Sequence, residues 1–149
     1  MKNDFVTYFC QYLDQISHEI SSYVNEDEIW KSIGDTKNSA GNLTLHIIGN
    51  LNHFIGKALA STEYERNRDA EFTKVNIQRI ELLEEIEHTK QLISKTLPHL
   101  NNLTDEYPEG YWHDSGSIHF QLLKLLSHLA YHAGQINYHR RGYTESQNN

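Results

Sequence analysis

Apolar side chains recur every three or four residues along most of this chain, which is the spacing of one face of an α-helix. The first such run contains Phe5, Phe9, Leu13, Ile16 and Ile20. Only two prolines occur in the chain, and a proline inside a helix would break or kink it. The pattern therefore predicts an all-α fold in which four long helices form a four-helix bundle.

Cap and breaker residues set the expected bounds of these helices. The first helix is expected over about residues 4–24, and the second from a cap at Ser39 to about residue 60. The third is expected over about residues 73–97, where a proline follows, and the fourth over about residues 117–141. We expect the fourth helix to end at Gly142, because glycine is favoured just beyond a helix C-terminus.

A chain of 149 residues is long enough for one domain with a core of its own. We assign residues 1–143 to a single bundle domain and residues 144–149 to a disordered tail. The polar segment 62–72 is expected to be a structured loop or short turn. On the third helix the residues expected to face the core are Val75, Ile80, Leu83, Ile86 and Ile93.

The charge balance argues against a nucleic-acid or anionic-membrane partner. The chain has 20 acidic residues against 13 Lys and Arg, a net charge of −7, whereas both partners are recognised by clustered positive charge. No apolar run approaches the roughly 18 residues of a membrane span, and the N-terminus does not resemble a signal peptide. The expected location is therefore the cytoplasm.

Ten histidines stand out, and two of them have the spacing of metal ligands. His128 and His132 are four residues apart on the fourth predicted helix, so their imidazoles lie one turn apart on the same side. The metalloprotease motif HExxH requires a glutamate after its first histidine, but position 129 is leucine. The pair by itself is equally consistent with two ligands and with two surface histidines.

The second helix offers a third ligand but does not identify it. His46 and His53 lie on nearly the same side of that helix, about 10.5 Å apart along its axis at 1.5 Å per residue. One metal ion therefore cannot bind both, and their positions do not decide between them. For His53, as for His119 and His139, a packing or surface role is the favoured interpretation.

Three segments resemble the DinB-like group of proteins, which includes the YfiT-type and bacillithiol-transferase branches. They are NLTLHIIGNLNHFI at residues 42–55, YERNRDAEF at residues 64–72 and SHLAYHAGQINYHRRG at residues 127–142. The resemblance implies a bundle of four helices that binds one divalent ion through three histidines. By position in these motifs, the implied ligands are His46, His128 and His132.

Three neutral imidazoles suit Zn²⁺ or Ni²⁺ best, with Mn²⁺ and Fe²⁺ as further possibilities, and they leave a coordination position open. Asn50 and Gln135 lie near the implied ligands and are candidates for orienting them, or for simple packing. Arg66 and Arg68 match the family motif. They are candidates for clamping a carboxylate-bearing thiol, although a role in pinning the loop is favoured.

The resemblance implies an enzyme that activates a low-molecular-weight thiol for transfer to an electrophile, and no catalytic side chain is assigned. A metal-dependent hydrolase and a non-catalytic, stress-associated metal-binding bundle are the alternatives. Members of the group commonly form homodimers, which is the expected assembly. The aromatic residues of the connection before the fourth helix, including Tyr107, Tyr111 and Trp112, are expected to be core rather than pocket residues.

Overall fold

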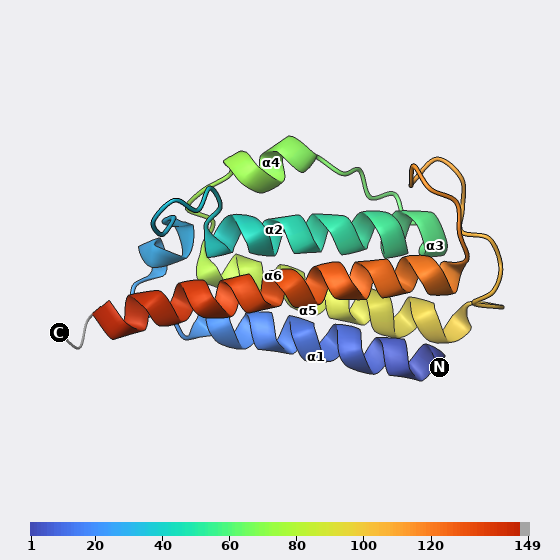
Figure 1. Cartoon of the computed structure of the whole chain (residues 1–149), viewed down its shortest axis with the longest axis horizontal. Coiled ribbons are helices and arrows are strands. Elements are labelled where there is room, and N and C mark those ends of the chain that lie inside the picture. Colours follow the sequence, from blue (N-terminus) through green and yellow to red (C-terminus); the bar gives the residue numbers. More distant parts are fainter. Residues whose placement is uncertain (147–149) are drawn as a thin grey trace.

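The computed structural model describes residues 1–146 and is built from helices, which confirms the predicted all-α class. The four long segments are α1 (Lys2–Ser21), α2 (Ala40–Leu51), α5 (Arg79–Thr96) and α6 (Ile118–Ser146). Helix α1 packs against α5 and α6, and α2 packs against the same two helices from the other side. The four therefore form a bundle, with α2 and α6 side by side in Figure 1.

Short elements connect the long helices. A 3₁₀ turn, η1 (Glu26–Trp30), precedes α2, and α2 continues through a π-helical turn, η2 (Asn52–Lys57), into α3 (Ala58–Ala60). Helix α4 (Arg68–Thr73) packs against α2 and lies above it in Figure 1. All but its last residue belong to the segment 62–72 that was predicted to be a loop or short turn. A last 3₁₀ turn, η3 (Leu97–His99), ends the α5 segment.

The core lies between the four long helices. On α1, α2 and α6 it consists of the apolar faces that the helical spacing predicts, whereas on α5 Leu82 is fully buried and the predicted Leu83 is only partly buried. The fully buried side chains of the core include Phe9, Leu13, Ile16 and Ile20 of α1, Ile47 and Leu51 of α2, Leu82, Ile86 and Ile93 of α5, and Leu122, Leu129 and Ile136 of α6. The second helix also begins as predicted, because the Ser39 hydroxyl accepts a hydrogen bond from the Asn42 amide at 3.1 Å. No helix of the described residues is both long and apolar enough to cross a membrane.

The prediction that the third helix begins at residue 73 is wrong. The chain leaves α4 at Thr73 and runs without regular secondary structure to Gln78, with Asn76 at a positive φ, before α5 begins at Arg79. Val75 in this connection and Ile80 in the first turn of α5 are exposed rather than in the core. The cause is a tertiary contact: the Asn42 side-chain amide donates to the carbonyl oxygens of Glu71 and Lys74, at 3.1 and 2.8 Å. A hydrogen-bond donor on α2 thus holds these carbonyls, which a continuing helix would have used internally.

The predicted end of the fourth helix is also wrong, because α6 continues through Gly142 to Ser146. A Cβ atom built on Gly142 would lie 3.3 Å from Ile33 Cδ1. The glycine therefore allows close packing against the connection before α2, rather than reversing the chain. Residues 144–146 of the predicted tail belong to α6, and residues 147–149 lie outside the described part of the chain.

Two helical glycines allow opposite predictions about stability. A Cβ on Gly41 would lie 2.6 Å from the Trp30 ring, whereas a Cβ on Gly134 meets nothing within 4 Å. We expect Gly41→Ala to lower the free energy of unfolding by about 1–3 kcal/mol through overpacking. Gly134→Ala should raise it by about 0.5–1 kcal/mol, because alanine favours a helix. Urea unfolding of both variants is the measurement, and a shift of the same sign in both would contradict this packing.

A buried histidine ties the connection before α2 to α6. His139 donates from Nε2 to the Lys31 carbonyl oxygen at 2.6 Å, and its Nδ1 accepts from the Tyr23 hydroxyl at 2.6 Å. Its side chain is almost fully buried, so the structural role favoured for this histidine agrees with its contacts. Burial lowers the pKa of His139 below its usual value, partly offset by the Lys31 carbonyl, so the folded protein keeps this ring neutral.

This neutral state makes stability depend on pH. As the pH falls below about 6.5, the unfolded chain takes up a proton at His139 that the folded chain resists, so the free energy of unfolding falls. We expect wild-type protein in chelator to lose up to about 1.4 kcal/mol per pH unit more than His139→Gln between pH 6.5 and the lowered pKa. Urea unfolding at several pH values tests this, and parallel profiles for the two proteins would refute it.

Candidate metal centre

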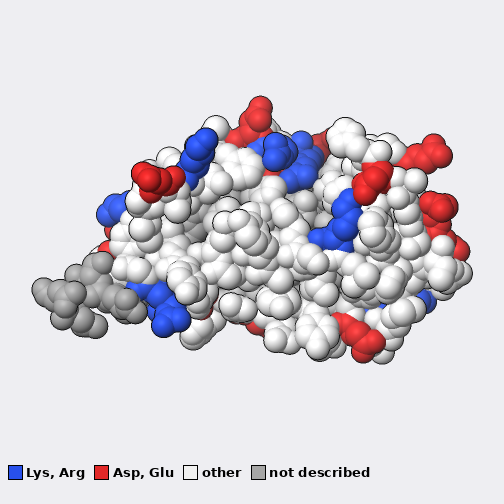
Figure 2. Space-filling view, in the orientation of Figure 1, with Lys and Arg blue, Asp and Glu red and all other residues white. Residues whose placement is uncertain are grey.

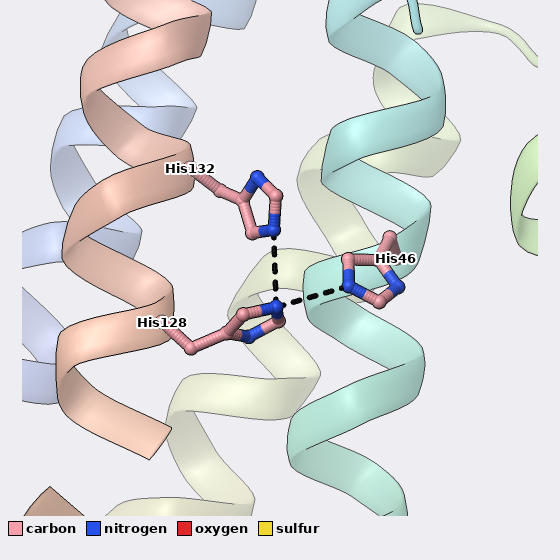
Figure 3. A group of neighbouring side chains, drawn as sticks. All are labelled: His46, His128 and His132. Atoms are coloured by element: carbon pink, nitrogen blue, oxygen red, sulfur yellow. Dashed lines mark hydrogen bonds between the residues drawn. The ribbon is translucent and has the colours of Figure 1, made fainter. Parts of the chain in front are cut away.

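Three histidine side chains from two helices point toward one another (Figure 3). His46 comes from α2, and His128 and His132 come from α6. The Nε2 atom of His128 lies 3.1 Å from Nε2 of His46 and 3.0 Å from Nε2 of His132. The three possible ligand atoms all lie within 4.8 Å of one another, so this group could hold a metal ion.

In the His46 and His132 rings, the Nδ1 atom points away from the centre of the group and makes a hydrogen bond that determines which nitrogen carries the proton. The His46 Nδ1–H donates to the Glu71 carboxylate at 2.8 Å, and the His132 Nδ1–H donates to Gln135 Oε1 at 2.6 Å. Gln135 Nε2 donates to the Tyr131 hydroxyl at 3.1 Å, which leaves Oε1 facing His132. In its neutral form, each of these two rings directs an Nε2 lone pair toward the centre of the group.

This arrangement fits a cation better than it fits a hydrogen-bonded cluster. Two lone pairs face His128 Nε2, which can offer one proton at most, so at least one lone pair has no donor. The Nδ1 atom of His128 is buried and has no hydrogen-bond partner among the described residues. A metal ion would satisfy all three Nε2 atoms at once, and ligating histidines typically donate their other N–H as His46 and His132 do.

The electrostatics of the group also favour ligation. Burial, with a contribution from His132 and His46, lowers the pKa of His128 to about 4. Burial likewise lowers the pKa of His132, although its hydrogen bond with Gln135 partly offsets this. These two imidazoles are therefore neutral near pH 7, which is the state that binds a metal ion.

Sequence reasoning missed the buried carboxylate of Glu71 on α4. It accepts the His46 Nδ1–H at Oε2, and Arg66 donates to it from Nε at 2.7 Å and from Nη2 at 3.0 Å. Burial alone would raise the pKa of Glu71, but the hydrogen bonds from His46 and Arg66 outweigh burial and lower it. A charged carboxylate thus orients the His46 ring from behind.

A glycine on α2 makes room for this carboxylate. A Cβ atom on Gly49 would lie 2.1 Å from Glu71 Oε1, so a larger residue there would displace the carboxylate. Gly49 lies three residues after His46 and therefore one turn along the same side of the helix. A glycine one turn after a candidate ligand, inside a predicted helix, was the available sequence signal for a close approach.

The other candidate residues lie around the group in different ways. Asn50 is buried one turn after His46, and its Oδ1 atom has no hydrogen-bond partner among the described residues. Gln135 contacts His132 directly, as given above. Arg66 is held by Glu71, which agrees with the structural interpretation of that arginine, and Arg68 is exposed with its guanidinium 5.6 Å from the Phe72 ring centre.

His53, the alternative ligand predicted on the second helix, lies in η2 and is not in the group. Its ring lies 4.8 Å from the Phe54 ring and 5.1 Å from the Tyr111 ring, centre to centre, so it belongs to an aromatic cluster. The π-helical turn η2 lies in this region, and its Phe54 carbonyl accepts a hydrogen bond from the Tyr107 hydroxyl. The structure therefore separates His46 of α2 from His53 of η2, which their positions in the sequence left equivalent.

A cavity of about 500 Å³ opens beside the histidine group. His46 and His128 form part of its wall, so a bound ion would be accessible from it. The expectation that Tyr111 and Trp112 are core residues is wrong, because both are only partly buried and line this cavity, whereas Tyr107 is buried as expected. The full lining is His46, Asn50, Phe54, Arg66, Arg68, Tyr111, Trp112, His113, Lys124, Leu125 and His128.

Comparison with known proteins adds a family but no activity. A family model with the description "Protein of unknown function (DUF1572)" matches residues 3–148, which is nearly the whole chain. A comparison with curated proteins found no match. The chain therefore belongs to the family described as a protein of unknown function (DUF1572).

Proposed function

We propose that this protein binds one divalent metal ion through His46, His128 and His132 and uses it to activate a low-molecular-weight thiol for S-transfer. We also propose that its family is part of the DinB-like group, which the three motifs of the sequence support. The observation that carries the proposal is the convergence of three Nε2 atoms, two of them with lone pairs directed inward by Glu71 and Gln135. Three histidines suit Zn²⁺ or Ni²⁺ best.

The protein residues would bind and orient, and the ion would supply the charge. Because the three ligands are neutral, a divalent ion would keep its full charge and favour the thiolate form of a thiol over the protonated form. Glu71 and Gln135 hold the rings of His46 and His132 in place. Asn50 presents a buried carbonyl oxygen at the cavity, where it can accept a hydrogen bond from a bound molecule.

The residues of the cavity favour thiol activation over hydrolysis. Attack by water is commonly assisted by a general base such as a histidine or a carboxylate, and beside the proposed ligands the described lining offers His113 for this role. No Asp or Glu lines the cavity in the described part of the chain, and both oxygens of Glu71 are already used by His46 and Arg66. A thiolate is also the stronger nucleophile near neutral pH.

Metal content is the first test. Elemental analysis of tag-free protein should find about one divalent ion per chain, with little in His46→Ala or His132→Ala. The matched control is His88→Ala, because His88 is exposed on α5 and does not belong to the histidine group. If both ligand variants kept the ion, or if the control lost it to the same extent, the metal would be bound by other residues than these three histidines.

Activity is the second test. The metal-loaded protein should accelerate the reaction of a small thiol with a chromogenic aryl halide, and the ligand variants should not. An activity toward esters that needs no thiol would replace the transferase by the hydrolase. Metal binding without turnover in either panel would leave the non-catalytic, stress-associated metal-binding bundle as the function.

We also propose that the protein acts as a homodimer. Large apolar side chains are exposed along α6, which is unusual for a helix facing only water. Size-exclusion chromatography with light scattering should give twice the mass of the chain for the wild type. For Leu123→Glu the measured mass should shift toward that of a single chain. A monomeric wild type would exclude the dimer. The exposed residues are Phe120, Leu123, Tyr131 and Tyr138.

A further inference from the structure

The cavity beside the histidine group has a charge opposite to that of the chain. The sequence has 20 acidic and 13 basic residues, yet the described residues lining this cavity include Arg66, Arg68 and Lys124 and no carboxylate. Figure 2 shows Lys and Arg side chains gathered in the upper middle of the face it presents. A cavity lined by one sign of charge raises the local concentration of ions of the other sign.

Aromatic rings of the cavity wall hold two of these cations, Lys124 and Arg66, in position. The Lys124 ammonium lies 4.2 Å from the centre of the Trp112 ring, and the Arg66 guanidinium lies 5.8 Å from that of Phe54. The Phe54 and Trp112 rings are stacked with their centres 4.0 Å apart and an angle of 13° between their planes. Such contacts between cations and ring faces fix the charges at the cavity without neutralising them.

The three cations differ in how strongly they are already paired. Arg66 is bound to the buried Glu71, so its charge is largely compensated. Lys124 contacts Asp114 at 2.9 Å, but this pair is open to solvent, with Lys124 33% and Asp114 54% exposed, and is therefore weak. Arg68 has no ion pair with any residue that the structure describes and lies against the Phe72 ring. Arg68 and Lys124 are thus the cations available to a ligand.

We infer that this cavity binds the anionic group of a small molecule, a carboxylate or a phosphate, between Arg68 and Lys124. Arginine and lysine are the usual partners of both groups, and a volume of about 500 Å³ is typical of small-molecule sites. This inference deepens the proposed function. Binding of the anionic group does not depend on that function, whereas the reaction of the rest of the molecule at the metal ion does. The anionic end would lie at the cations while His46 and His128 face the remainder of the same cavity.

The two tryptophans of the chain provide a test with an internal control. Trp112 lines the cavity, whereas Trp30 packs against Gly41 at the start of α2 and does not line it. Each indole N–H gives one signal in a ¹⁵N-correlated NMR spectrum, and Trp112→Phe assigns the two. Malonate and inorganic phosphate are titrated separately into zinc-free protein, which distinguishes a carboxylate from a phosphate as the preferred group.

We expect the Trp112 signal to shift and saturate with at least one of the two anions at about millimolar concentration, while the Trp30 signal stays in place. The double variant Arg68→Gln/Lys124→Gln should weaken binding at least about tenfold, which corresponds to about 1.4 kcal/mol. The control Lys57→Gln, which also removes a positive charge but does not line the cavity, should bind as the wild type does.

Three results would overturn the inference: no saturable shift with either anion, equal shifts for uncharged malonamide, or unchanged binding by the double variant. The same titration of His132→Ala separates this inference from the metal proposal, because His132 does not line the cavity. Anion binding in that variant would support the cavity even if no metal bound to the wild type. Metal binding without anion binding would leave the metal site and remove the anionic substrate.

Discussion

Adding Zn²⁺ to metal-free protein should raise the free energy of unfolding by about 4 kcal/mol when free Zn²⁺ exceeds its dissociation constant about a thousandfold. The reason is that the three histidines are brought together only in the folded chain, since His46 is 82 residues from His128 in the sequence. An ion that binds the folded state alone stabilises that state in proportion to its binding. Urea unfolding with and without Zn²⁺ measures the effect.

The ligand variants make this expectation specific. His132→Ala should remove most of the stabilisation, and a chelator should reverse it in the wild type. His88→Ala should respond to Zn²⁺ as the wild type does, because its side chain is exposed and lies outside the histidine group. Equal stabilisation of the wild type and His132→Ala would mean that Zn²⁺ binds to other residues.

Replacing Glu71 with alanine should lower the free energy of unfolding of the metal-free protein by about 3–5 kcal/mol. The carboxylate is 6% exposed and holds both His46 and Arg66, so its removal leaves a largely buried guanidinium without its partner. The metal affinity should also fall about 10–100-fold, because the His46 ring loses the group that orients it. Urea unfolding and a competitive zinc titration are the two measurements.

Two further variants show whether the loss of stability in Glu71→Ala comes from the missing charge or from the missing packing. Glu65→Ala removes an exposed acid that pairs with Lys57 at the surface, and it should change the free energy of unfolding far less than Glu71→Ala does. Glu71→Gln keeps the volume and an acceptor for His46 but removes the charge that faces Arg66. A loss in Glu71→Ala no larger than in Glu65→Ala would show that the buried network contributes little to stability.

The helical repeat of the sequence was sufficient for the fold class but not for every helix boundary. Helix α2 begins at the cap predicted from Ser39, because a cap forms between residues three positions apart. Helix α5 begins at Arg79 instead of residue 73, because Asn42 binds the backbone of the preceding segment. A contact between residues about thirty positions apart leaves no periodic signal in either segment.

The candidate site divides in the same way. The spacing of His128 and His132 was enough to place both on one side of α6, because residues four positions apart in a helix lie about one turn apart on the same side. Spacing alone could not choose between His46 and His53, because that choice depends on which turn of α2 faces α6. The family resemblance selected His46, and the structure brings that residue to the pair.

What the sequence determined by itself was therefore local: the all-α class, the apolar faces that form the core and the histidine pair on one helix. The tertiary structure decided which groups meet from distant segments, namely His46 with the pair, Glu71 behind His46, and the cations Arg68 and Lys124 around one cavity. The physical reason is that a helix fixes neighbours within one or two turns, whereas packing of separate helices fixes all the others.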